Sequence, residues 1–501
     1  MNRGLIFFAL LLLSLSARAS DFPRPASLEP AVQFWTRVYT EVSTNQGFVH
    51  DARHLAVVYE TLDLPVYGSN AQRQKVQDAA KARIVSALNA LARGKREHLD
   101  ATETRVLAAW PAGTSNATLR EAAQNVRFQL GQSDRFREGL VRAGQWKPYI
   151  RQVLADQGLP AELDVLPHVE SSFNPAAWSR VAAAGMWQFM PATARQFMRV
   201  DHVVDQRMDP FTSTEGAARL LKRNYAVTGT WPLALTGYNH GAAGMVRATK
   251  AVGSNDIGKI IATYNGPAFG FASRNFYPSF LAALDVDRQA ERFFPGLKPQ
   301  APVDYEVVTL SEYIPASALA QGAGISVADL QLHNPALREP IWKGDKYLPR
   351  GYPLRLPRGQ LPKSLDSYLA AIPSQQRFSN QKPDRTHRIA PGDSLWLIAR
   401  RYNTSVDRLK ALNGMRGDNL RVGKTLILPG SLVAEPAIAT LTRQPSAPRV
   451  YTIRKGDSLW SIAKRFQVSH EQLAAWNGLS EKHYLHPGQT LRVAAMDNTQ
   501  R

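Results

Sequence analysis

The chain has 501 residues, 44% of them hydrophobic, and no cysteine. This length is too great for one hydrophobic core, so the sequence predicts two to four domains. The missing cysteines exclude disulfides, thiolate metal sites, cysteine nucleophiles and lipid attachment to cysteine. The formal net charge of +20 suggests nucleic acid as the partner of a cytosolic protein, but an exported protein meets other polyanions as well.

The N-terminal residues 1–19 have the composition of a secretory signal. Arg3 precedes an apolar run from Leu5 to Leu15, and Ala17-Arg18-Ala19 is a small-x-small cleavage site. The run is too short to span a bilayer, so we expect a cleaved signal peptide and no stable membrane insertion; an uncleaved anchor is the alternative. Residues 20–145 have a helical periodicity without a chemical motif, which predicts a helical N-terminal region.

Residues 146–295 contain a lone acid in an apolar context. Glu170 lies in "LPHVESSFNP" (166–175), which is followed by "GMWQFMP" (185–191) and "GYNHG" (237–241). A carboxyl surrounded by aromatic side chains is desolvated and keeps its proton near neutrality, which suits an acid that protonates a glycosidic oxygen. No second acid is embedded in this way, because capping and pairing with Arg207 explain Asp205 and Asp209.

These three motifs, in this order, resemble the signature of the lytic transglycosylase family. The resemblance implies a helical lysozyme-like domain over 146–295, in which Glu170 acts first as acid and then as base. The muramyl C6 hydroxyl then attacks the anomeric carbon and gives a 1,6-anhydromuramyl product, with no metal or cofactor. The resemblance also implies that substrate is bound by Ser171, Gln188, Tyr238, Asn239 and Tyr277, the last one position beyond the tyrosine of relatives.

An internal repeat occupies the C-terminal part of the chain. "HRIAPGDSLWLIARRYNTSVDRLKALNG" (387–414) returns as "YTIRKGDSLWSIAKRFQVSHEQLAAWNG" (451–478), each predicted as strand, helix, helix and strand. The repeats resemble LysM modules, which bind N-acetylglucosamine-containing glycans, over 386–429 and 449–494. We expect Trp396 and Trp460 in the module cores, with sugar stacking as the alternative. The resemblance implies a glycan groove that contains Gly392, Asp393, Ser394, Gly456, Asp457 and Ser458.

A weaker copy of the repeat spans 303–357. It keeps a strand, an alanine-rich helix and Asn334, but it lacks the Gly-Asp turn and the tryptophan. It is either a degenerate LysM or a plain linker domain. Residues 358–385 and 430–448 are rich in Pro, Ser, Gln and charge, which predicts flexible linkers.

The expected fold class is multidomain and mainly α, with a lysozyme-like catalytic domain followed by small α+β (βααβ) LysM modules. The expected function is that of a peptidoglycan lytic transglycosylase, periplasmic and cell-wall associated, that cleaves the MurNAc-GlcNAc β-1,4 bond. Peptidoglycan glycan strands are the expected partner, and protein partners are left open. A hydrolytic muramidase of the same fold and a non-catalytic peptidoglycan-binding protein are the alternatives; the signal peptide disfavours a nucleic-acid binder.

Overall fold

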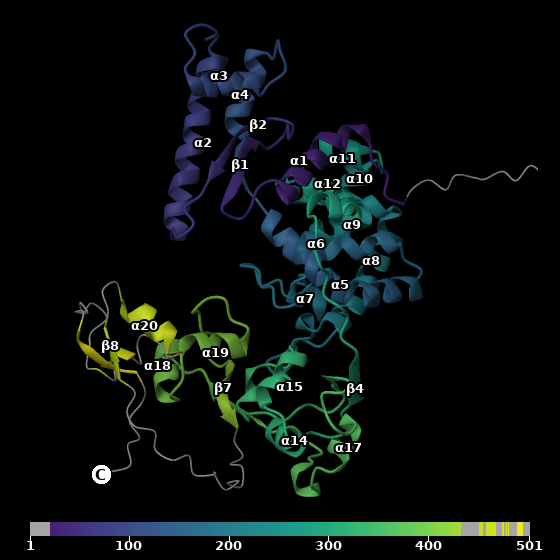
Figure 1. Cartoon of the computed structure of the whole chain (residues 1–501), viewed down its shortest axis with the longest axis vertical. Coiled ribbons are helices and arrows are strands. Elements are labelled where there is room, and N and C mark those ends of the chain that lie inside the picture. Colours follow the sequence, from purple (N-terminus) through teal and green to yellow (C-terminus); the bar gives the residue numbers. More distant parts are fainter. Residues whose placement is uncertain are drawn as a thin grey trace, which may run out of the picture. The chain divides into compact units, whose positions relative to one another are not determined.

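The computed structural model describes residues 21–431 and, with gaps, residues 450–493 (Figure 1). The expected signal peptide and most of the expected linker 430–448 lie outside the described residues. The chain divides into two compact units, 1–432 and 433–501, and each is considered by itself. None of the described helices combines the length and the apolar character that crossing a membrane requires.

The domain expected over 146–295 is a helical bundle whose core also includes residues nearer the N-terminus (Figure 1). Helix α1 (Glu29–Thr40) packs against α12 (Phe271–Arg288) and against α5 (Ser133–Asp156). One buried core therefore joins residues 22–55 to residues 136–294. The other helices of the bundle are α6 (Leu166–Ser171), α7 (Pro191–Ala194), α8 (Pro210–Thr228), α9 (Trp231–His240), α10 (Ala242–Val252), α11 (Ile257–Thr263) and α13 (Ala290–Phe293).

A small α+β module is inserted between α1 and α5, where the sequence suggested only helices. Its antiparallel sheet has the order β2 (Val58–Asp63), β1 (Gln46–Asp51), β3 (Val126–Leu130). The module also contains α2 (Asn70–Ala92), α3 (Ala101–Ala108) and α4 (Asn116–Asn125). Strand β1 is buried on both faces: Phe48 belongs to the core of the helical bundle and Val49 to the core of the module. A strand buried on both faces lacks the polar alternation that identifies strands in a sequence.

Residues 305–357 fold as a separate small module within the first unit. Strands β4 (Tyr305–Thr309) and β5 (Pro353–Pro357) pair antiparallel, and they enclose α14 (Ala316–Ala323), α15 (Val327–His333) and α16 (Glu339–Trp342). The following segment, expected as a flexible linker over 358–385, is structured. It contains α17 (Leu365–Ala370), and the Phe378 ring stacks on Tyr347 with 4.3 Å between centroids. Apolar residues spaced within a polar segment anchor it to the module.

The first predicted repeat has the expected order of elements. Strand β6 (Asp384–Arg388) pairs with β7 (Thr425–Ser431), and α18 (Leu395–Arg401) and α19 (Val406–Asn413) lie between them in the sequence. In the second repeat, β8 (Val450–Thr452) pairs with β9 (Thr490–Arg492), and α20 (Leu459–Arg465) follows β8. Each repeat has its own small apolar core.

Candidate active site

Glu170 lies in the last turn of the short helix α6. The helix ends at Ser171 because Ser172 has left-handed backbone angles, with φ of 52°. Desolvation by the surrounding protein raises the pKa of Glu170 to about 8. In the described part of the chain, no side chain or backbone group forms a hydrogen bond or an ion pair with the Glu170 carboxylate. The carboxyl is therefore protonated at neutral pH, and its oxygens accept no hydrogen bond from the described residues.

The loop 185–189 forms one wall beside this acid and is held at nearly every residue. A Cβ atom on Gly185, whose φ is +79°, would lie 1.7 Å from the Arg207 carbonyl oxygen, so only glycine fits. The Ser171 hydroxyl donates to the Met186 carbonyl oxygen over 2.7 Å. The buried Trp187 ring donates to the Thr214 hydroxyl over 2.9 Å. Ser171 thus joins the Glu170 helix to the loop through a hydrogen bond to the loop backbone. This bond positions the loop.

Gln188 and Tyr238 also belong to this wall. The Gln188 side-chain nitrogen donates to the Gly185 carbonyl oxygen over 2.7 Å. Its Oε1 accepts no hydrogen bond from any described residue, so an acceptor remains for a ligand. The Tyr238 hydroxyl donates to the Trp187 carbonyl oxygen over 2.8 Å, which matches the alternative of a tyrosine satisfied by backbone. The pKa of Tyr238 is raised by burial and, to a lesser degree, by the charge of Glu170, which places the two side chains near each other.

Asn239 is exposed at the end of α9 and contacts residues that the sequence did not indicate. Its Oδ1 accepts a hydrogen bond from the Ser273 hydroxyl over 3.2 Å, and His240 Nδ1 lies 3.2 Å from the same hydroxyl. Ser273 lies in the first turn of α12. No motif of the sequence pointed to this serine.

Tyr277 does not belong to the site, in contrast to the expectation. Its side chain is fully buried, and its hydroxyl donates to the Pro23 carbonyl oxygen over 2.7 Å. A shift of one position on a helix rotates a side chain by about 100°. Tyr277 therefore points into the packing between α12 and the N-terminal segment, and it does not replace the tyrosine of relatives.

The two aspartates of the turn 205–209 have structural roles, as expected. Asp205 forms a bidentate ion pair with Arg207, at 2.8 and 2.7 Å, and both side chains are buried. Asp209 caps α8 and pairs with Arg355 over 2.8 Å. Neither carboxylate is free to act as a second catalytic acid. No group of three or more His, Cys, Asp or Glu residues within the described ranges is placed to hold a metal ion.

The expected groove residues of the repeats mostly serve their own loops. Gly392 has φ of +86°, and the Asp393 carboxylate accepts from the Ala390 amide over 2.8 Å and contacts His387 Nε2 at 2.7 Å. Ser394 and Ser458 bond the amides of Leu397 and Ser461, and Asp457 accepts from the Tyr451 hydroxyl. Gly456 lies outside the described residues, as does the Trp460 side chain.

Trp396 is not in the core of the first repeat, in contrast to the expectation. Its side chain is 59% exposed, and the Arg400 guanidinium lies 5.4 Å from its ring centroid. The neighbouring Leu395 and Ile398 fill the core of the repeat instead. The sugar-stacking alternative is therefore the one that its exposure allows.

Comparison with known proteins places these features in a family. The family model for the transglycosylase SLT domain matches residues 149–261, and the LysM domain model matches 387–429 and 451–494. The membrane-bound lytic murein transglycosylase D of Escherichia coli (strain K12) is 30% identical over 370 residues, which cover 72% of this chain and 78% of that protein. The matches confirm the resemblance and the mainly α, multidomain fold class.

Other similarities are shorter. An N-acetylmuramoyl-L-alanine amidase sle1 of Staphylococcus saprophyticus is 33% identical over 128 residues, 26% of this chain and 36% of that one. A solved structure of an inactive mutant of lytic transglycosylase Slt from Pseudomonas aeruginosa has 19% sequence identity and a TM-score of 0.25, over 47% of this chain and 34% of that chain. On the strength of its similarity to the E. coli protein, the chain belongs to the lytic murein transglycosylase D family, with an SLT domain and LysM modules.

Proposed function

We propose that the protein cleaves the β-1,4 bond between MurNAc and GlcNAc in peptidoglycan without using water, and that Glu170 is its single acid and base. The observation that carries this proposal is the state of the Glu170 carboxyl. Its raised pKa of about 8 keeps it protonated at neutral pH. Its oxygens have no hydrogen-bond partner among the described residues, so the proton can be given to a substrate oxygen.

Among the described residues, the acids considered as a second catalytic group are already paired, which supports an internal nucleophile. Hydrolytic glycosidases place a second carboxylate about 5 to 9.5 Å from the acid, to attack the sugar or to activate water. The acids of the turn 205–209 are consumed by Arg207 and Arg355, and no neighbouring carboxylate contributes to the raised pKa of Glu170. A hydroxyl of the substrate itself meets the need for a nucleophile without a second acid.

The reaction then balances with one carboxyl group. Glu170 gives its proton to the glycosidic oxygen as the bond between that oxygen and the muramyl C1 breaks. The resulting carboxylate takes the proton of the muramyl C6 hydroxyl as the oxygen of that hydroxyl forms a bond to C1. The products are a 1,6-anhydromuramyl end and a free GlcNAc 4-hydroxyl, and Glu170 is again protonated. The desolvation that raises the pKa of Glu170 also disfavours water that would compete with the C6 hydroxyl.

Two further side chains are suited to hold the sugar. The free Oε1 of Gln188 accepts a hydrogen bond, and the exposed Asn239 amide nitrogen donates one. Ser171 and Tyr238 act by fixing the loop 185–189 rather than by touching substrate. The LysM modules hold the enzyme on the insoluble wall, where several weak sites on one chain raise the effective concentration. Together with the expected N-terminal signal, wall binding supports our proposal of a periplasmic, cell-wall-associated enzyme.

Product analysis tests the proposal. Purified mature protein is incubated with sacculi, and the released fragments are examined by mass spectrometry. We expect muropeptides lighter by one water than hydrolysis products and without a reducing muramyl end. Reducing muramyl ends would identify a muramidase instead, and no released fragments at all would identify a non-catalytic wall-binding protein.

A further inference from the structure

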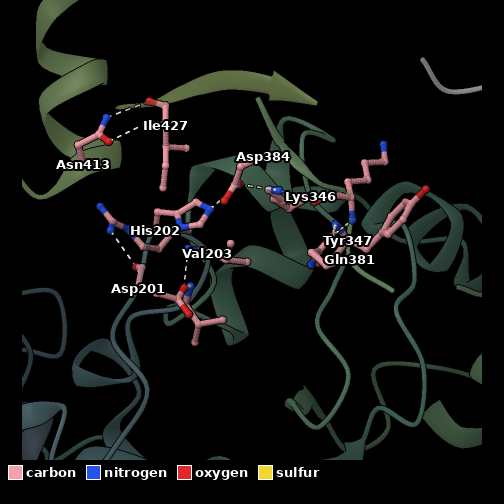
Figure 2. Close-up of polar contacts among 12 residues, drawn as sticks. Asp201, His202, Val203, Lys346, Tyr347, Gln381, Asp384, Asn413 and Ile427 are labelled. Atoms are coloured by element: carbon pink, nitrogen blue, oxygen red, sulfur yellow. Dashed lines mark hydrogen bonds and ion pairs between the residues drawn. The ribbon is translucent and has the colours of Figure 1, made fainter. Parts of the chain in front are cut away.

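The three small modules share one hydrogen-bond signature. Asn413 donates its side-chain amide to the Leu409 carbonyl oxygen over 2.8 Å. It also donates to the Ile427 carbonyl oxygen over 2.9 Å, and its Oδ1 accepts from the Ile427 amide over 2.7 Å (Figure 2). The asparagine thereby joins the end of the second helix to the middle of the second strand.

The same arrangement occurs at the two other asparagines. Asn477 makes the equivalent bonds to Leu473 and to Arg492 of β9. Asn334 makes them to Leu330 and to Arg355 of β5, over 2.8, 2.9 and 3.0 Å. The module 305–357 therefore has the internal bonding of the two matched repeats, although its sequence lacks their Gly-Asp turn and tryptophan.

The loop after the second helix of this third module is bound to the catalytic domain. The Asp205 amide donates to the Ala336 carbonyl oxygen over 2.8 Å, and the Arg338 amide donates to the Val203 carbonyl oxygen over 3.0 Å. Val204, which is 1% exposed, belongs to the apolar core of the module. The segment 201–205 of the catalytic domain thus packs as an additional part of the module.

Charged groups strengthen the same junction. The Arg355 guanidinium pairs with the buried Asp209 carboxylate over 2.8 Å and lies 4.5 Å from the centroid of the Phe211 ring. At its edge, the Asp384 carboxylate lies 2.9 Å from His202 Nε2 and 2.7 Å from Lys346 Nζ (Figure 2). Removing one partner of a buried pair leaves an uncompensated charge, so such a contact favours one fixed arrangement.

The junction continues directly to the wall of the active site. Asp205, whose amide is held by the module, orients Arg207 through two hydrogen bonds. Arg207 Nη1 donates to the carbonyl oxygens of Ala182 and Phe189, over 2.8 and 3.0 Å. Its own carbonyl lies against Gly185. Arg207 therefore contacts both ends of the loop 185–189, and Asp205, which orients Arg207, is itself bound by the module.

We infer that residues 303–357 are a third LysM-fold module that serves as a positioning element of the catalytic domain, with Arg207 as the residue through which it acts on the active-site loop. Its partner surface is the segment 201–211, not a glycan. The activity measurements that test this inference rest on the proposed function. It explains why the module keeps the asparagine of the fold and has lost the turn and tryptophan of the matched repeats.

Three asparagine variants give a matched test, because each removes the same bonds from a different module. Asn334→Ala, Asn413→Ala and Asn477→Ala are compared on soluble glycan fragments and on binding to insoluble sacculi. We expect Asn334→Ala to lower kcat on soluble fragments about tenfold or more and to leave sacculus binding unchanged. Asn413→Ala and Asn477→Ala should weaken sacculus binding and leave soluble turnover within about twofold. Weakened sacculus binding with normal turnover in Asn334→Ala would overturn the inference.

The pH profile separates positioning from loss of folded protein. A displaced loop admits water to Glu170 and lowers its pKa, so the alkaline limb of kcat/KM should move down by about one pH unit or more in Asn334→Ala. An unshifted limb with reduced amplitude would mean only that less protein is folded, and the inference would fail. Arg355→Gln supplies a second variant, because it breaks the pair with Asp209 while the backbone bonds to Asn334 remain, and the same shift is expected.

A thermal measurement distinguishes failure of this inference from failure of the proposed function. If the wild-type protein releases no fragments, the proposed function fails and activity readouts cannot be used. Calorimetry still decides the inference: the catalytic domain and the module should unfold in one transition, and Arg355→Gln should lower its midpoint. Two separate transitions, of which Arg355→Gln moves only one, would show that the module is independent.

Discussion

The Tyr238 hydroxyl donates to the Trp187 carbonyl oxygen over 2.8 Å, and its ring lies within the electrostatic reach of Glu170. This single bond ties the end of α9 to the loop 185–189 and closes the loop beside the acid. The hydroxyl is thus engaged by the protein itself. We expect this bond to hold the loop in place and so to maintain the raised pKa of Glu170.

Tyr238→Phe should therefore weaken catalysis indirectly. The substitution leaves the Trp187 carbonyl without its donor, which costs about 1–3 kcal/mol of stability. We expect kcat/KM to fall about tenfold, and its alkaline limb to move to lower pH as water reaches Glu170. Urea denaturation and a pH-rate profile provide the two measurements. A loss of activity as large as that of a Glu170 variant, with normal stability, would instead indicate direct proton transfer by the tyrosine.

Glu170→Gln should separate lysis from binding. An amide has the shape of the acid but no proton to give, so we expect release of fragments to fall by about 10²–10⁴-fold, the range for a positioned general acid. Binding to sacculi should persist, because the LysM modules are untouched. Fragment release is followed by mass spectrometry and binding by co-sedimentation. Undiminished lysis by this variant would refute the assignment of Glu170.

The pKa of Glu170 sets the alkaline limit of activity. The acid must be protonated to act, so kcat/KM should decline as pH rises through about 8, the folded-state pKa. Other acids titrate near pH 4 and leave no such limb. The rate on soluble fragments, measured between pH 5 and about 10, checks this prediction. A limb near pH 4 to 5 would mean that the carboxyl is solvated during turnover.

The same shift has a consequence for stability. Below the unfolded-state pKa, near 4.5, Glu170 is protonated in both the folded and the unfolded state. Its ionisation then does not change the free energy of unfolding. As pH rises from there to about 8, only the unfolded state ionises, so the folded state is progressively disfavoured. Glu170→Gln should thus be more stable than wild type by roughly 2–4 kcal/mol at pH 8, reduced for partial solvent access, and equal at pH 4. Equal stability of the two proteins at both pH values would contradict a desolvated carboxyl.

The local parts of the site followed from the sequence because the motifs carry their own geometry. The sequence alone identifies the lone acid in an apolar helix. It also identifies the glycine of the following motif, the only residue type that fits against the Arg207 carbonyl. Relations between distant segments were not visible. Helix α1 shares a core with α12 although the inserted module separates them in the chain, and no local pattern reports such a partner.

The fate of Tyr277 shows the same limit on a smaller scale. The expectation that Tyr277 reaches the cleft depended on helix phase, which a single sequence does not fix to one position. The polar residue that faces Asn239 is Ser273, a full turn earlier. Similarly, Trp396 was expected inside because aromatic residues on amphipathic helices usually are, yet the smaller Leu395 and Ile398 fill that core.

Tyr277→Phe should accordingly affect stability and not catalysis. Its hydroxyl bonds only the Pro23 carbonyl among the described residues, within the packing of α12 on the N-terminal segment. We expect the free energy of unfolding to fall by about 1 kcal/mol and kcat/KM to stay within about twofold. Thermal denaturation and soluble-fragment assays make the comparison. A large fall in kcat with unchanged stability would return Tyr277 to the catalytic site.

Trp396→Ala should weaken glycan binding by the first repeat without unfolding it. The ring is 59% exposed, so its removal leaves no cavity, and the repeat should melt within about 1 °C of wild type. An exposed ring beside the groove loop 392–394 offers a stacking surface to a sugar, worth about 0.5–1.5 kcal/mol by analogy with aromatic pairs. Titration with N-acetylglucosamine oligomers measures this loss, with Asp393→Asn, whose loop bonds are internal, as a control for stability. Unchanged affinity in Trp396→Ala would show that the exposed ring does not contribute to glycan binding.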